Sequence, residues 1–263
     1  MKYLSKNIED TLVKKDAVVL FFLGQAGFCI KTSSDQMIVI DAYLSDAAER
    51  LFGFRRMIPA IIDPKELEAD LFLSTHSHID HLDLDIIPII AKHAPTFFVG
   101  APDCREYYEE MGLKQNRFAI IDEGESFEKS GVKITGVYAD HGELAPKAIG
   151  LLVEIDGIKI YHVGDTCYRP EEIKESLKSE VDIMIAPING QYGNMTALEA
   201  CQLSEVVKPK ILIPSHYWMF LEHVSKGGVG DPATFLEHSS KLSKGTKPLV
   251  MAPGEKFEYI KEK

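Results

Sequence analysis

The sequence predicts an α+β protein in which two β-sheets pack face to face and are covered by helices. Short segments rich in branched and aromatic residues follow one another through the first half of the chain, as strands of a sheet do. In the second half, similar segments alternate with longer segments of helical pattern. Two runs of strands, with helices between and after them, are typical of two packed sheets under a cover of helices.

The first half contains a series of strand-like segments. The opening ones, "AVVLFFL", "GFCIKT" and "MIVID", are separated by the turn-like sequences "GQAG" and "SSDQ". A helix is indicated in "DIIPIIAKH", behind a histidine-rich segment. The strands expected in this half lie at 17–23, 27–32, 37–41, 71–75, 96–100, 118–121 and 132–139.

The second half begins with a predicted hairpin and continues with alternating helices and strands. The segment "GLLVEIDGIKIYHVGD" reads as two strands joined at Asp156-Gly157, a dipeptide that favours a tight turn. The elements expected after it are a helix from Pro170, a strand at 182–187, a helix at 196–207, a strand at 210–215, a helix at 231–242 and strands at 248–252 and 256–260.

Composition and charge narrow the class of protein. With 45% hydrophobic and 26% charged residues, the chain fits one globular domain over residues 1–263 with a sizeable core. A net charge of -11 argues against nucleic acid as a partner, because Lys and Arg must neutralise phosphates. The run "AVVLFFL" is too short to span a bilayer, so no membrane partner is expected.

The N-terminal segment does not show the positive region, apolar stretch and small-residue cleavage site of a signal peptide in the right order. The four cysteines include no pair at CxxC spacing, which argues against a disulfide framework or a zinc ribbon. We therefore expect a cytoplasmic protein. The negative net charge does not exclude a small anionic substrate, because a bound metal would supply a local positive charge, and a homo-oligomer is left open.

Four polar clusters each follow a strand-like segment. Because strand ends on one rim of a sandwich can converge, side chains far apart in sequence can form one site there. Imidazole and carboxylate suit zinc, manganese or iron, and one or two divalent ions would need about this many ligands. The residues in these clusters are His76, His78, Asp80, His81, Asp140, His141, Asp165 and His216.

The alternative is a solvated polar loop that happens to be rich in histidine. In a chain with 9 histidines, a chance H-x-H-x-D-H pattern has a probability on the order of one in a thousand. The spacing therefore favours a metal site.

The segment "THSHIDH" resembles the signature of the metallo-β-lactamase fold, a four-layer αβ/βα sandwich with metals at the sheet rim. The resemblance implies that one metal is held by His76, His78 and His141, a second by Asp80, His81 and His216, and that Asp165 bridges both. Asp41, at the end of "MIVID", is expected to support the cluster rather than to bind metal.

Longer segments resemble the L-ascorbate-6-phosphate lactonase group of this superfamily. They are "FLGQAGFCIK", "YHVGDTCY", "MIAPINGQYGNMTALEA" and "ILIPSHYWMF". The resemblance implies that a metal-bound hydroxide opens a sugar-acid lactone, with manganese as the metal. Asp80 or Asp165 would then pass a proton to the leaving alkoxide.

Other functions remain open at this point. A glyoxalase-type thioesterase or a phosphodiesterase would use the same metals, and a non-enzymatic metal-binding protein would use the same ligands. A di-iron oxidoreductase is a further alternative, because ligand type does not fix the metal. No G-x-S-x-G motif is present, which argues against a covalent serine mechanism.

Two loops are candidates for contact with substrate. Gln25 lies in the turn between the first two strands, and "NGQYGN" precedes a helix with Thr196 as a plausible N-cap. The amides of that loop and of the helix start could receive a phosphate or carboxylate, although a plain capped turn is an equal alternative. The substrate-binding candidates are Gln25, Tyr192, Asn194 and Tyr217.

The remaining conspicuous side chains have simpler interpretations. His162 is expected to be packed or to support the site, and Cys167 to be an inert small thiol. Three further histidines fall in helical or loop patterns in which no partner side chain can be identified, so they are expected on the surface. They are His93, His223 and His238.

Overall fold

Both predicted sheets are present, and each has seven strands among the residues that the structure describes. The computed structural model describes residues 2–226, 230–242 and 244–261. The chain forms two compact units, the first from the residues up to Ile120 together with the segment from Met251 on, and the second from Ile121–Val250. No Pro-, Gly- or Ser-rich linker marks either boundary in the sequence.

The sheet of the first unit is antiparallel on one side and parallel on the other. Strands β14, β1, β2 and β3 pair antiparallel, and β3, β4, β5 and β6 pair parallel. In spatial order the strands are β14 (Lys256–Ile260), β1 (Ala17–Gly24), β2 (Gly27–Thr32), β3 (Met37–Ile40), β4 (Leu71–Ser74), β5 (Phe97–Gly100) and β6 (Phe118–Ile120).

The central strands of this sheet are almost continuously apolar. All residues of β3 and β4 are buried, and β1 is buried up to its last residue. Strands covered on both faces show this pattern instead of the alternation of a half-exposed strand. The helical segments of this unit are α1 (Lys2–Glu9), α2 (Ala47–Phe52), η1 (Pro64–Glu66), α3 (Ile87–His93), α4 (Cys104–Glu110) and η2 (Gln115–Arg117).

The sheet of the second unit has the same plan. Strands β7 to β10 pair antiparallel, and β10 to β13 pair parallel. In spatial order the strands are β13 (Lys247–Pro248), β12 (Ile211–Ser215), β11 (Ile183–Pro187), β10 (Ile158–His162), β9 (Ile149–Ile155), β8 (Val132–Tyr138) and β7 (Ser126–Lys129).

The predicted Asp156-Gly157 hairpin is confirmed. Asp156 has φ 50° and Gly157 has φ 78°, and Ile155 pairs with Ile158 across the turn. Two consecutive residues with positive φ give the turn type whose twist matches that of the flanking strands.

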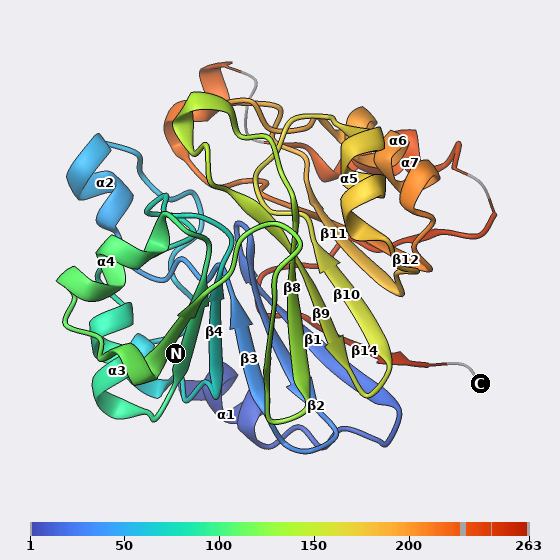
Figure 1. Cartoon of the computed structure of the whole chain (residues 1–263). Helices are drawn as coiled ribbons and strands as arrows, with labels where there is room; N and C mark the ends of the chain where they lie inside the picture. The colour runs from blue at the N-terminus through green and yellow to red at the C-terminus, as the bar shows by residue number, and fades with distance from the viewer. Residues whose placement is uncertain (1, 227–229, 243, 262–263) are drawn as a thin grey trace. The chain divides into compact units, whose positions relative to one another are not determined.

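Helices of the second unit cover its sheet. Helix α6 packs against β11, β12 and α7, and α5 packs against β8 and α6. Figure 1 shows α5, α6 and α7 side by side next to β10, β11 and β12. The helical segments of this unit are η3 (Gly142–Leu144), α5 (Pro170–Leu177), α6 (Ala197–Val207), η4 (Leu221–Lys226) and α7 (Pro232–Ser239).

The prediction of a full strand at 248–252 is wrong. Only Lys247–Pro248 forms a strand, and one further ladder bond joins the amide of Leu249 to the carbonyl of Leu212. The boundary between the two units, at Val250 and Met251, falls inside the predicted strand. In the described ranges, no helix is both long and apolar enough to cross a membrane.

Candidate metal centre

Strand direction explains how polar side chains gather at one edge of the first sheet. Strand β1 runs in the same direction as β3, because both are antiparallel to β2, and β4 is parallel to β3. The residues that follow β1, β3 and β4 therefore lie at the same edge. These residues are Gln25, Asp41 and the segment 75–81.

Asp41 is the hydrogen-bond acceptor at the centre of this edge. Its Oδ1 accepts from the Thr75 amide at 2.8 Å, and its Oδ2 accepts from the Thr75 hydroxyl at 2.7 Å. The Nδ1 of His81 lies 2.8 Å from the same Oδ2. All three side chains are fully buried. A carboxylate can only accept here, so Nδ1 of His81 carries the proton and Nε2 offers its lone pair.

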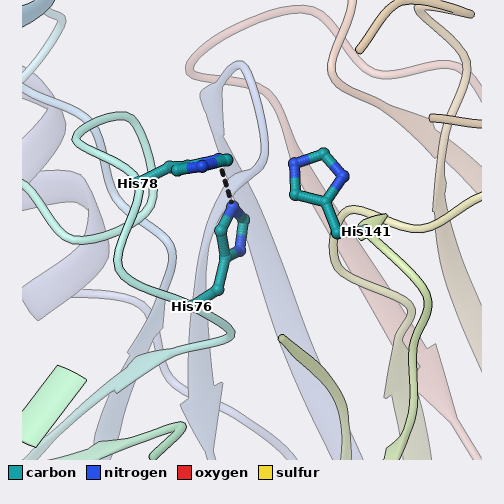
Figure 2. A group of neighbouring side chains, drawn as sticks. All are labelled: His76, His78 and His141. Atoms are coloured by element: carbon teal, nitrogen blue, oxygen red, sulfur yellow. Dashed lines mark hydrogen bonds between the residues drawn. The ribbon is translucent and has the colours of Figure 1, made fainter. Parts of the chain in front are cut away.

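His76 and His78 lie next to each other in the same segment. Nε2 of His76 is 3.0 Å from Nδ1 of His78, a contact that Figure 2 marks with a dashed line. Nδ1 of His76 is 3.0 Å from the Thr75 hydroxyl. Two nitrogens that bind one ion at about 2.0–2.1 Å lie roughly 3–3.4 Å apart. The two nitrogens are therefore spaced as ligands of one metal.

Gln25 reaches the same group of side chains from the β1–β2 turn. Its Nε2 donates to Oδ2 of Asp80 at 3.0 Å and lies 3.3 Å from Nε2 of His81. Its Oε1 accepts from the amide of Ala26. The residue expected to contact substrate thus contacts two of the expected metal ligands.

Asp83 fixes the loop that carries the histidines, a role that the sequence analysis missed. Its carboxylate accepts from the amides of Leu44 and Ser45 and from the Ser45 hydroxyl. Burial raises the pKa of the Asp83 carboxyl, and these hydrogen bonds oppose that rise. The available signal was a second aspartate two residues after the H-x-H-x-D-H pattern.

The second sheet also gathers its polar residues at one edge. Strand β8 runs in the same direction as β10, because both are antiparallel to β9, and β11 and β12 are parallel to β10. The segments after these strands therefore end at a common edge. They contain His141 after β8, Asp165 after β10, Asn194 after β11 and His216 after β12.

One oxygen of Asp165 is the meeting point of this group. Its Oδ2 lies 3.7 Å from Nε2 of His141 and 3.3 Å from Nε2 of His216. Nδ2 of Asn194 donates to the same oxygen at 2.8 Å. All four side chains are buried. Two imidazoles and one carboxylate oxygen thus face each other within this unit.

Backbone hydrogen bonds join the loops that hold these residues. The amide of Cys167 donates to the carbonyl of Asp140 at 2.8 Å, and the amide of Met195 donates to the carbonyl of Thr166 at 3.0 Å. The Thr166 hydroxyl accepts from the amide of Asp140 at 2.8 Å. The two residues directly after Asp165 are therefore fixed to the segments that follow β8 and β11.

Cys167 lies beside this centre but is poorly suited to react. Its thiol is half-buried, and burial, together with the carboxylate of Asp140, raises the pKa of the thiol. A raised pKa reduces the fraction of nucleophilic thiolate at neutral pH. This environment agrees with the expectation of an inert thiol.

The other candidate residues of the second unit lie in different environments. Tyr192 is 44% exposed, whereas Tyr217 is buried with its ring edge-on to Trp218. His162 is buried at the end of β10, where its Nδ1 accepts from the amide of Gly164.

The expectation that His223 lies on the surface is wrong. His223 is buried in η4, its ring packs edge-on against Phe220, and its Nε2 lies 3.4 Å from the Tyr192 hydroxyl. The sequence around it has no helical or strand periodicity that would reveal this packing. His93 is exposed, and His238 is partly exposed.

The donor atoms in the two units fit a divalent metal. Imidazole nitrogens and carboxylate oxygens without thiolate suit manganese, zinc or iron. The Asp41–His81 contact is of the kind that orients a metal-binding imidazole through its other nitrogen. The side chains that offer suitable ligand atoms are His76, His78, Asp80 and His81 in the first unit and His141, Asp165 and His216 in the second.

Comparison with known proteins defines the class. A family model described as a beta-lactamase superfamily domain matches residues 19–216. Igni18, a metallo hydrolase of Ignicoccus hospitalis, matches with a TM-score of 0.73 at 20% identity, over 94% of this chain and 100% of that chain. The metallo-β-lactamase fold protein YhfI of Bacillus subtilis matches with a TM-score of 0.67 at 15% identity, over 93% and 100%. The chain has the metallo-β-lactamase fold, which confirms the predicted fold class.

Curated relatives define the family within this class. A UPF0173 metal-dependent hydrolase of Thermococcus onnurineus is 35% identical over 248 residues, which cover 90% of this chain and 97% of the relative. One of Pyrococcus abyssi is 30% identical over 246 residues, with coverage of 90% and 97%. The chain belongs to the UPF0173 metal-dependent hydrolase family of the β-lactamase superfamily.

Proposed function

We propose that this metal-dependent hydrolase opens a lactone or cleaves an ester of a small anionic molecule. The observation that carries the proposal is the Asp165 oxygen that faces Nε2 of both His141 and His216. A carboxylate in this position can bind metal and also exchange a proton with a reacting group. The absence of thiolate from the donor set favours a metal that acts on water rather than one that only stabilises a fold.

We propose one or two divalent ions, manganese or zinc, with iron left open. When bound, such a metal acidifies a water to a pKa of about 7 and polarises the carbonyl of the substrate. One ion would be held by His76, His78 and His141, and a second by Asp80, His81 and His216, with Asp165 shared. Within the first unit, the 3.0 Å separation of the His76 and His78 nitrogens supports the first assignment.

The chain's own residues would position the reactants and move the proton. Asp80 or Asp165 would take a proton from the attacking water and pass it to the leaving alkoxide, and Gln25 and Asn194 would hold these carboxylates in place through their amide hydrogen bonds. Asn194 would also contact the substrate. Among the described residues, its buried Oδ1 has no hydrogen-bond donor within reach, which suits a substrate hydroxyl. Gln25, Tyr192 and Tyr217 complete the proposed substrate contacts.

We further propose a phosphorylated sugar-acid lactone such as L-ascorbate 6-phosphate as the substrate. With a net charge of -11, the protein repels such an anion at long range, so recognition must be local. The first turn of α6 is a suitable place for a phosphate. Its capping box already uses the amides of Thr196 and Glu199, so the phosphate would contact other amides of this turn and of the loop before it.

The test compares kcat/KM for a phosphorylated lactone and its unphosphorylated parent on metal-loaded protein. We expect the phosphorylated lactone to be preferred by at least about tenfold, because remote binding energy helps to position the carbonyl. A ratio near one would remove phosphate from the proposal. Faster turnover of a thioester or a phosphodiester in the same panel would replace the lactone with a glyoxalase-type or phosphodiesterase substrate.

We also propose that the protein works in the cytoplasm on a small molecule, without nucleic acid or membrane partners. Its four cysteines are free, which is usual in a reducing compartment. A homo-oligomer is left open, and sedimentation would decide it.

A further inference from the structure

Gln25 has an unusual backbone for its residue type. It has φ 56° in the β1–β2 turn, a conformation that costs a non-glycine side chain free energy. Its side chain is nevertheless buried. The turn also packs closely, since a Cβ on Gly27 would lie 3.1 Å from Cα of Ala42. The turn thus holds a strained glutamine in a defined place beside Asp80 and His81.

The orientation of the Gln25 carboxamide follows from its partners. The Ala26 amide can only donate, so the group that faces it is Oε1. The NH₂ group is therefore directed at Oδ2 of Asp80 and Nε2 of His81, 3.0 and 3.3 Å away. Both are acceptors, since the contact with Asp41 places the imidazole proton of His81 on Nδ1.

A hydrogen bond at Nε2 of His81 and a metal bond at the same atom exclude each other. A neutral imidazole has one lone pair at this nitrogen, and the Gln25 amide uses it. A carboxylate differs, because its two oxygens offer about four acceptor positions. Asp80 can therefore accept from Gln25 and bind a metal at once, whereas His81 cannot.

We propose that Gln25 competes with the metal for Nε2 of His81 and so lowers the affinity of the metal position that Asp80 and His81 serve. This inference rests on the proposed function, in which these two residues are metal ligands. When a metal binds, the amide must turn away from His81. Gln25 is thus a positioning residue whose amide becomes available to the substrate only when this metal is present.

Asn194 provides an internal comparison. Its Nδ2 donates to Oδ2 of Asp165 at 2.8 Å, a carboxylate oxygen that can also bind metal. Removal of this amide should not free a metal-binding lone pair. The two carboxamides should therefore act differently on metal affinity, although both donate to a ligand carboxylate.

The experiment measures Zn²⁺ binding to the full chain by calorimetric titration after chelator treatment, with elemental analysis for stoichiometry. The variants are Gln25→Gly, which also relieves the positive φ, and Gln25→Leu, which keeps the side-chain bulk. In both, the Zn²⁺ equivalent that depends on His81 should bind about tenfold more tightly, since one competing hydrogen bond is lost. Asn194→Leu should show no tightening, and exposed Gln202→Leu on α6 should match the wild type.

Unchanged or weaker binding in both Gln25 variants would overturn the inference, and so would equal tightening in Asn194→Leu. His81→Ala separates this result from the proposed function. If His81→Ala keeps every Zn²⁺ equivalent at wild-type affinity, the ligand assignment itself fails. If His81→Ala loses one equivalent while the Gln25 variants do not tighten, only the role of Gln25 is refuted.

Discussion

Asp41 shows how one residue can organise several metal-binding side chains. It lies directly after β3 with φ 46°, and three donors from Thr75 and His81 converge on its two oxygens. The carboxylate sets the imidazole tautomer of His81 and fixes the start of the segment that carries His76. Loss of a hydrogen bond that orients a metal-binding imidazole commonly lowers metal affinity by about 10- to 100-fold.

Asp41→Asn should weaken metal binding by about 10- to 100-fold while the chain still folds. An asparagine offers one oxygen, so its NH₂ group must face either Thr75 or the protonated Nδ1 of His81, and one donor is left without an acceptor. The measurement is Zn²⁺ affinity by calorimetric titration, with circular dichroism to verify folding. Glu128→Gln, an exposed change on β7 that also removes one charge, is the control. Equal affinity in Asp41→Asn and in the control would contradict this account of His81.

At the residue scale, the sequence predicts which side chains are candidate metal ligands better than it predicts what those side chains contact. The H-x-H-x-D-H spacing is local, so it is visible without a structure. The contact of Gln25 with His81 spans 56 positions and depends on a strained turn, which no periodicity indicates. The burial of His223 likewise depends on how η4 folds over Phe220 and Tyr192.

At the element scale, α6 shows how a helix start fixes the loop before it. Thr196 accepts from the amide of Glu199, and the carboxylate of Glu199 accepts from the amide of Thr196 at 2.8 Å. This capping box satisfies two amides that the helix leaves without intrahelical partners. Because Asn194 lies two residues before the cap, the cap also restrains the residue that donates to Asp165.

Thr196→Ala should lower the free energy of unfolding by about 1 kcal/mol, the usual cost of losing an N-cap side chain. The measurement is urea denaturation followed by circular dichroism. Ser240→Ala, which removes an exposed hydroxyl at the end of α7, is the control and should change stability by less than about 0.5 kcal/mol. An unchanged midpoint for Thr196→Ala would show that the capping box does not stabilise the fold.

Elements with strong local signals could be predicted, and some short helices could not. The N-cap at Thr196 and the Asp156-Gly157 turn are set by adjacent residues, and both form as expected. Helix α2 has six residues and α4 has seven, too few for a hydrophobic period to appear. Strand β13 ends just before the boundary between the two units, which depends on contacts distant in sequence.

At the scale of the whole molecule, the two sheets follow one plan. In each, strands of alternating direction give way to parallel strands, so several strands end at the same edge. This plan explains why candidate metal ligands separated by many residues gather within each unit. The sequence suggested one domain, because the unit boundaries at Ile120 and Val250 carry no linker composition.

The central claim is that the chain is a hydrolase whose activity depends on metal held by His76, His78, Asp80, His81, His141, Asp165 and His216. The most direct measurement is the metal content of protein purified without added metal, combined with turnover of a lactone and ester panel before chelation, after chelation and after reloading with Mn²⁺ or Zn²⁺. We expect one or two equivalents of metal, loss of turnover on chelation and its recovery on reloading. His78→Ala and Asp165→Ala should lose both metal and turnover. Full metal content in His78→Ala, or turnover that survives complete removal of metal, would contradict the claim.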